Sequence, residues 1–172
     1  MVIEGERVVL RRLCKDDADA LVQYGDNRSI WRNLRDAFPS PYTLDAARDW
    51  IETSTTVDEF RYSFAIAIDG EVTGMVGVIP KSEVHCKTAE LGYWIGEPFW
   101  GRGLVTEAVG LICQFAFSEL GVARVEAYVY EWNPASGRVL EKNGFELEGR
   151  QRKSVFKDGE LIDQFVYAKV SP

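Results

Sequence analysis

The sequence has 172 residues, of which 46% are hydrophobic, and it carries a formal net charge of −7. A chain of this size and composition is expected to form a single domain, residues 1–172, around one core. The negative charge argues against direct binding to nucleic acid, and the absence of an apolar run of about 18 residues argues against a membrane span.

The N-terminal quarter of the chain alternates short elements with a long loop. Residues 6–13 (ERVVLRRL) predict a first strand, and residues 16–24 predict a short helix whose apolar side chains share one face. Two prolines, together with Asn and Ser, make residues 25–42 mostly loop. Thr43 is a suitable N-cap for a second helix, which carries an apolar stripe.

The middle of the chain predicts three strands and a helix. Residues 62–68 and 72–79 flank Asp69-Gly70, a dipeptide that is typical of a hairpin between two alternating segments. A third strand follows at residues 89–95. It leads through a glycine-containing loop into a helix at residues 105–120, which is apolar on most sides and therefore expected to be largely buried.

The C-terminal third predicts a strand at residues 124–130 and then a helix that Asn133 caps and Pro134 opens. Two last strands, residues 145–156 and 161–170, are joined through Asp158-Gly159 as a second hairpin. The resulting order β-α-α-β-β-β-α-β-α-β-β predicts an α+β, or mixed α/β, fold. Its sheet should be mostly antiparallel, with helices on both faces.

The most informative segment is residues 90–108 (ELGYWIGEPFWGRGLVTEA). A strand enters a loop containing Gly101 and Gly103, and a helix begins at once, so several unpaired backbone N–H groups should converge and attract an anion. Thr106 adds a hydroxyl donor and Arg102 a positive charge. A plain turn is the alternative, and the segment matches neither GxxxxGK[ST] nor a dinucleotide fingerprint.

This segment resembles motif A of the GNAT superfamily of N-acetyltransferases, here Trp100-Gly101-Arg102-Gly103-Leu104-Val105. It is closest to the branch that contains the RimJ and RimL ribosomal-protein acetyltransferases, although Val105 departs from the usual Gly or Ala. Two further segments resemble that branch: residues 38–43 (FPSPYT), and Asn133-Pro134-Ala135-Ser136 with its Asn143-Gly144-Phe145 end. The resemblance therefore covers nearly the whole chain.

The resemblance implies a GNAT-like twisted sheet in which two parallel strands, residues 91–95 and 125–130, splay apart. Acetyl-CoA would be the cosubstrate, with its pantetheine arm in the gap and its pyrophosphate on the glycine loop. The residues implied to bind it are Trp94, Ile95, Gly96, Trp100, Gly101, Arg102, Gly103, Leu104, Val105, Thr106, Asn133 and Arg138. For Asn133 a simple N-cap is the alternative, and for Arg138 a solvated helix face.

The resemblance also implies two catalytic residues. Glu90 would be the base that activates the amine, directly or through water, and a solvated or salt-bridged carboxylate is the alternative. Ser136 would protonate or stabilise the departing thiolate, and a purely structural role in the first helical turn is the alternative.

The acceptor side is implied to be the loop with Trp31, Asn33, Phe38 and Tyr42, for which packing of a long loop is the alternative. The expected function is transfer of acetyl to a primary amine by direct attack in a ternary complex, with a protein or peptide N-terminal α-amine favoured. A small-molecule acceptor (antibiotic, polyamine or amino acid) and a non-catalytic coenzyme A-binding module are the alternatives. A homodimer is left open.

Three cysteines with no CxxC spacing and a single histidine give no metal-ligand pattern, so we expect no metal and no disulfide. The N-terminal residues carry charges where a signal peptide would be apolar, so we expect a cytoplasmic enzyme.

Overall fold

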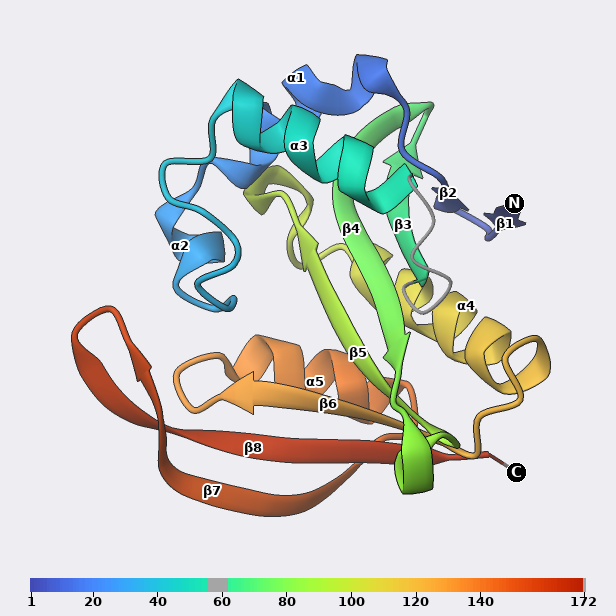
Figure 1. Ribbon diagram of the computed structural model, residues 1–172, viewed down its shortest axis with the longest axis vertical. Coiled ribbons are helices and arrows are strands. Elements are labelled where there is room, and N and C mark those ends of the chain that lie inside the picture. Colours follow the sequence, from blue (N-terminus) through green and yellow to red (C-terminus); the bar gives the residue numbers. More distant parts are fainter. Residues whose placement is uncertain (56–61, 172) are drawn as a thin grey trace.

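The computed structural model describes residues 1–55 and 62–171, which form an eight-stranded sheet with helices on both faces (Figure 1). The strands are β1 Val2–Glu4, β2 Val9–Arg11, β3 Tyr62–Ile68, β4 Glu71–Pro80, β5 Thr88–Ile95, β6 Arg124–Tyr130, β7 Glu146–Lys157 and β8 Glu160–Val170. The helices are α1 Ala18–Gly25, α2 Arg28–Trp31, α3 Leu44–Thr55, α4 Leu104–Ser118 and α5 Pro134–Lys142, with 3-10 turns at Lys15–Asp17, Glu83–His85 and Glu97–Phe99.

The strand order in the sheet is β1-β2-β3-β4-β5-β6-β8-β7. Neighbouring strands are antiparallel throughout the described residues, except for β5 and β6, which are parallel. The connection between these two strands is helix α4, as a parallel pair requires. The predicted mixed α/β fold with a mostly antiparallel sheet is confirmed.

The parallel strands β5 and β6 separate along their length. They pair only between Thr88–Glu90 and Arg124–Glu126, although β5 continues to Ile95 and β6 to Tyr130. In Figure 1 the two strands start together and then diverge. The predicted splayed pair is therefore confirmed, and it leaves an open edge in the centre of the sheet.

Two apolar clusters, one on each face of the sheet, hold the helices in place. Helix α4 and the second half of α5 pack on one face, against side chains such as Leu91 and Ile95 of β5. Helices α1 and α3 pack on the other face, where Trp94 joins the cluster. Successive side chains of a strand point to opposite faces, so β5 contributes to both clusters.

The N-terminal strand differs from the prediction. In place of one strand over residues 6–13, the chain makes a tight hairpin in which β1 pairs with β2, closed by a 2.9 Å bond from the Gly5 N–H to the Val8 carbonyl. A Cβ at Gly5 would lie 2.5 Å from Oε1 of Glu107, so only glycine fits against α4. This long-range contact leaves no signal in the local sequence pattern.

Helix α2 lies within the segment predicted to be mostly loop. Asn27 caps it by accepting the N–H of Ser29 at 2.8 Å. Four residues are too few to show a helical period, so this helix could not be predicted from apolar spacing.

The described residues show neither a membrane span nor a metal-ligand cluster. None of the helices in residues 1–55 and 62–171 is long and apolar enough to cross a membrane. Within these same ranges, no three His, Cys, Asp or Glu side chains lie together as a ligand set. Cys14 and Cys86 are exposed and Cys113 is buried, and none of them forms a disulfide.

Candidate active site

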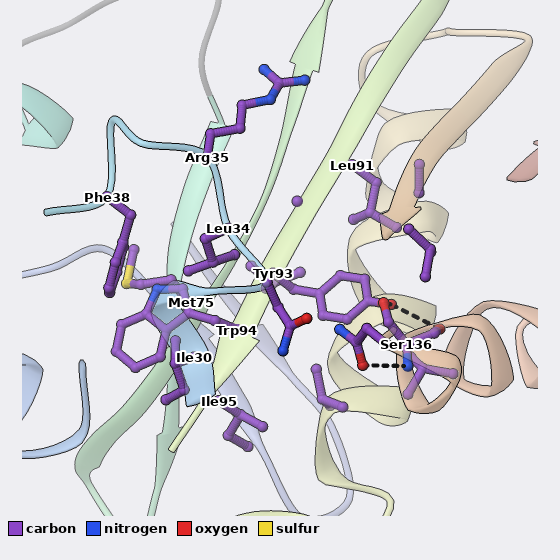
Figure 2. A pocket seen from close by; sticks show the side chains of 18 of the residues that line it. Ile30, Leu34, Arg35, Phe38, Met75, Leu91, Tyr93, Trp94, Ile95 and Ser136 are labelled. Atoms are coloured by element: carbon purple, nitrogen blue, oxygen red, sulfur yellow. Dashed lines mark hydrogen bonds between the residues drawn. The ribbon is translucent and has the colours of Figure 1, made fainter. Parts of the chain in front are cut away.

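A cleft of about 1330 Å³ opens where β5 and β6 diverge. It is lined by the following predicted site residues: Asn33, Phe38, Tyr42, Glu90, Trp94, Ile95, Trp100, Gly101, Gly103, Leu104, Val105, Thr106, Asn133, Ser136 and Arg138. Figure 2 shows part of the cleft, with Tyr93 and Ser136 on one side and Phe38 on the other. The predicted residues Trp31, Gly96 and Arg102 are not part of its lining.

The loop between β5 and α4 presents unpaired backbone N–H groups to this cleft. Gly101 and Gly103 have φ values of 72° and 76°, a left-handed conformation that turns the chain directly into the helix. Among the described residues, no acceptor bonds the N–H groups from Gly101 to Thr106, and the first bonded one is that of Glu107, to the Gly103 carbonyl at 3.1 Å. The loop and the helix dipole together can therefore hold an anion.

Arg7, in the turn between β1 and β2, braces this loop. Its Nη1 donates to the Arg102 carbonyl at 2.9 Å, and its Nε donates to Oε2 of Glu107 at 3.0 Å. The Arg7 backbone N–H also donates to Oε1 of Glu107, at 2.8 Å. Burial alone would raise the pKa of Glu107, but these hydrogen bonds outweigh it and hold the pKa below its usual value. Glu107 is thus ionised, and its hydrogen bonds to Arg7 connect the first turn of α4 to the N-terminal hairpin.

We expect Glu107→Gln to lower the free energy of unfolding at pH 7 by about 1 to 2 kcal/mol, because it weakens charge-assisted hydrogen bonds. The carboxylate has a lower pKa in the folded state than in the unfolded chain. Its contribution is therefore fully present above the unfolded value, about 4.3, and is lost as the pH falls through the folded value. Urea unfolding at pH 7 and pH 3 should show the difference between wild type and variant shrinking at pH 3.

Glu119→Gln, just after the C-terminal end of the same helix, is the matched control and should change stability little at either pH. A Glu107→Gln deficit that is as large at pH 3 as at pH 7 would contradict this account of the brace.

The open edge of β5 offers the backbone N–H and carbonyl of Tyr93 and the backbone N–H of Ile95. The N–H of Gly96 donates to the Thr73 carbonyl of β4 at 2.8 Å, and backbone groups of successive residues point to opposite edges of a strand. The backbone N–H and carbonyl of Trp94 therefore point toward β4, and those of Tyr93 and Ile95 point into the gap. The predicted backbone contacts from Trp94 and Gly96 are corrected, because the backbone groups of Trp94 face β4 and the Gly96 N–H is already bonded there.

Two side chains of the glycine loop have roles other than direct ligand contact. The indole Nε1 of Trp100 donates to the Ile95 carbonyl at 2.7 Å, which fastens the loop to the end of β5. The guanidinium of Arg102 lies 5.7 Å from the ring centre of Phe99, outside the lining of the cleft. Direct contact of the Arg102 side chain with a ligand is thus not supported, and what this residue offers to the site is its backbone N–H.

Glu90 lies on β5 at the point where the parallel pairing ends. Its side chain is 24% exposed, and Oε1 is ion-paired with the guanidinium of Arg35 from the loop after α2. Among the described residues, no donor bonds its other oxygen, Oε2. The carboxylate is therefore salt-bridged, as one interpretation held, and it also faces the cleft with a free oxygen.

A second carboxylate, Glu126, stands beside Glu90 on β6 but is differently placed. It is buried and accepts hydrogen bonds from Lys81, from Tyr128 at 2.9 Å and from Arg124 at 3.2 Å. Burial alone would raise its pKa, but these donors hold the pKa below its usual value. Both oxygens of Glu126 are hydrogen-bonded, whereas Glu90 keeps one oxygen without a donor among the described residues.

Ser136, in the first turn of α5, forms a hydroxyl pair with Tyr93. The Tyr93 Oη lies 2.7 Å from the Ser136 Oγ and 3.2 Å from the Ser136 carbonyl oxygen (Figure 2). Burial raises the pKa of Tyr93, more than the hydrogen bond from Ser136 lowers it, so its hydroxyl keeps its proton at neutral pH. Asn133 acts as the N-cap and accepts the Ser136 N–H at 3.3 Å.

Sequence reasoning missed Tyr93. The available signal was a hydroxyl-bearing side chain in the strand predicted to splay. Tyr93 alternates there with Leu91 and Ile95, so all three side chains lie on the same face of β5. Its proximity to Ser136 was not visible, because it depends on how α5 packs beneath the gap.

The predicted acceptor residues Phe38 and Tyr42 pack against each other at the edge of the cleft. Their rings stack at 4.7 Å, and Phe38 also contacts Trp94 edge-on at 5.6 Å. Burial raises the pKa of Tyr42 to about 12. Asn33 donates from Nδ2 to the Ser29 carbonyl at 2.8 Å, while its Oδ1 is buried without a partner in the described part of the chain. Packing accounts for the two rings, whereas Asn33 keeps an open acceptor.

Trp31 is not among the residues that line the cleft, so the structure does not support its predicted place at the acceptor site. The Lys157 Nζ lies 3.8 Å from the centre of its ring and donates to Asp36 at 2.6 Å. Arg28 pairs with Asp158 at 2.7 Å. The turn of the β7–β8 hairpin therefore contacts the α2 region through these side chains, and Trp31 serves that contact. In Figure 1 the tip of this hairpin lies on the same side of the molecule as α2.

These features fit coenzyme A. The open N–H groups of residues 101–106 suit a pyrophosphate, and the gap-facing edge of β5 suits the amides of a pantetheine arm. Arg138 and Lys142 are exposed on α5 and line the same cleft, and neither has an ion-pair partner among the described residues. Their charges are available to a further phosphate.

Comparison with known sequences agrees with this geometry. Residues 7–146 match the family described as an acetyltransferase (GNAT) domain. The chain is similar to the SPbeta prophage-derived uncharacterized N-acetyltransferase YokL of Bacillus subtilis (strain 168), with 32% identity over 161 residues, 92% of this chain and 87% of YokL.

Comparison with solved structures gives the same fold. RimL, a ribosomal L7/L12 α-N-protein acetyltransferase in complex with coenzyme A, has a TM-score of 0.86 at 22% identity, covering 99% of this chain and 98% of RimL. The microcin C7 self-immunity acetyltransferase MccE, in complex with acetyl-CoA and AMP, has a TM-score of 0.83 at 25% identity, covering 97% of this chain and 94% of MccE.

Proposed function

Because the chain belongs to the GNAT family of acetyltransferases and is an N-acetyltransferase, we propose that it transfers acetyl from acetyl-CoA to the N-terminal α-amine of a peptide or protein. One observation carries the proposal. The unpaired N–H groups of residues 101–106 open onto a gap that has a free carboxylate oxygen, that of Glu90, and the Tyr93–Ser136 hydroxyl pair in its lining.

Acetyl-CoA, when bound, supplies an acetyl group activated as a thioester. Glu90 takes the proton that the acceptor amine must lose, directly or through one water, using the oxygen that Arg35 leaves free. The Tyr93–Ser136 pair supplies a proton to the departing thiolate, and burial keeps that proton on Tyr93 until it is needed. The cleft also orders the two substrates, and such positioning supplies roughly 7 to 11 kcal/mol in well-oriented reactions.

An α-amine suits this machinery better than a lysine side chain. An α-amino group has a pKa of about 7.7 to 8.0, so roughly a tenth of it is neutral at pH 7, whereas a lysine near 10.4 must lose its proton at a cost of about 4.6 kcal/mol. One carboxylate with a single free oxygen is then a sufficient base. RimL, by its name a protein α-N-acetyltransferase, supports this acceptor.

The test is an acceptor panel read out by thiol release. Peptides with free N-termini should be acetylated, and the same peptides with blocked N-termini should not, even when they contain lysine. If polyamines or aminoglycosides are acetylated as fast as the peptides, the proposed peptide acceptor is rejected in favour of a small molecule. No turnover of any amine, with acetyl-CoA still producing a thermal shift, would make the chain a coenzyme A-binding module.

A further inference from the structure

Three buried polar atoms at the acceptor side of the cleft have no partner among the described residues. They are the Arg32 Nε, the Trp132 Nε1 and the Asn33 Oδ1. All three residues line the cleft, and the Arg32 guanidinium carbon lies 4.1 Å from the ring centre of Trp132. Buried polar groups are nearly always hydrogen-bonded, so three orphans lining one cleft indicate a polar site that is incomplete without a ligand.

Arg32 also differs from the arginines on either side of it. Arg28 pairs with Asp158, and Arg35 pairs with Glu90, but no carboxylate pairs with Arg32 in the part of the chain that the structure describes. Stacking on Trp132 holds the planar guanidinium in place, and its N–H edge has no acceptor within residues 1–55 and 62–171. A fixed guanidinium with free N–H groups is the arrangement that recognises a carboxylate.

The location of this pair ties it to the proposed chemistry. Arg32 lies three residues before Arg35, which holds Glu90, and Trp132 directly precedes Asn133, which caps the helix of Ser136. The orphans comprise two donors and one acceptor. A ligand that satisfies them offers acceptor oxygens to Arg32 and Trp132 and an N–H group to Asn33.

We propose that Arg32, Trp132 and Asn33 form an acceptor subsite that selects amines carrying a nearby carboxylate. The proposal rests on the acetyl transfer proposed above and names its substrate class. The carboxylate belongs either to an acidic side chain at a peptide N-terminus or to the α-carboxylate of a free amino acid, which share the same chemistry.

The test compares acceptors that differ by one carboxylate. Asp-Ala-Ala-amide is compared with Asn-Ala-Ala-amide, and free alanine with alaninamide, by kcat/KM. In at least one pair the wild type should prefer the carboxylate by about tenfold or more, as expected for a hydrogen-bonded charge pair. Arg32→Gln should abolish that preference, and Trp132→Phe, which keeps an aromatic ring for the stack but loses the indole N–H, should reduce it. Arg48→Gln, the same charge change at an exposed position on α3, should keep it.

A binding measurement separates this proposal from the proposed function. With coenzyme A present, N-acetyl-Asp-Ala-Ala-amide and N-acetylalanine are titrated by calorimetry against N-acetyl-Asn-Ala-Ala-amide and N-acetylalaninamide. A carboxylate preference that Arg32→Gln removes supports the subsite even if no amine is turned over, in which case the proposed function alone fails. The subsite is overturned if the wild type shows no preference in either measurement, or if the preference survives in Arg32→Gln.

Discussion

Replacing Gly101 by aspartate is expected to weaken acetyl-CoA binding by about a hundredfold. The added carboxylate would stand among the N–H groups of residues 101–106, where the diphosphate is expected to bind. Two like charges about 5 Å apart at an effective dielectric constant of about 20 repel by roughly 3 kcal/mol, which corresponds to that loss. The dissociation constant can be measured by calorimetric titration.

Gly101→Asn is the matched control, because it has nearly the same shape and no charge. A Cβ at Gly101 would meet no heavy atom within 4 Å, and both Asp and Asn tolerate the left-handed conformation of this residue better than other side chains do. The asparagine variant should therefore bind within a few-fold of wild type. An equal loss of acetyl-CoA affinity in the two variants would mean that the added side chain blocks binding by its size. Unchanged affinity in both would show that the diphosphate does not bind at this loop.

Glu90→Gln is expected to lower kcat by about 10²- to 10³-fold, the usual contribution of a general base, while leaving acetyl-CoA affinity unchanged. The substitution keeps the size of the side chain and removes the oxygen charge that accepts the proton. Single-turnover acetylation of a peptide acceptor measures the rate of the chemical step, and equilibrium titration measures the affinity.

Arg35→Gln distinguishes a base from a structural ion pair. If Glu90 serves only to hold Arg35, removing either partner should cost the same. If Glu90 is the base, Arg35→Gln should retain most of the rate, within about tenfold, because the carboxylate itself remains. Glu160→Gln, an exposed carboxylate in β8, should have no effect. A rate for Glu90→Gln close to that of wild type would exclude Glu90 as the base.

The sequence predicted those turns and helix starts that are determined by a few adjacent residues. The two hairpins at Asp69-Gly70 and Asp158-Gly159, the helix opened by Asn133-Pro134 and the glycine entry to α4 are all present. In each case the signal is a conformational demand on a few adjacent residues. The hairpin of β1 with β2 was not predicted, because it depends on Glu107, about 100 residues away.

In the candidate site, too, features set by adjacent residues could be predicted and contacts between distant segments could not. The glycine loop and the exposed edge of β5 follow from adjacent residues, so they could be predicted. The partners of the side chains could not, because each comes from a distant segment: Arg35 for Glu90, Tyr93 for Ser136, and Lys157 for Trp31. The stack of Arg32 on Trp132 is of the same kind, since 100 residues separate the two.

Open N–H groups at the start of α4 are expected to hold a diphosphate beside a gap in the sheet. The most direct measurement is a crystal structure of the protein with coenzyme A. We predict diphosphate oxygens within about 3 Å of the N–H groups of residues 101–106, with the pantetheine arm along the free edge of β5. A diphosphate bound elsewhere, or N–H groups in this loop that are bonded to the protein's own acceptors, would contradict the account.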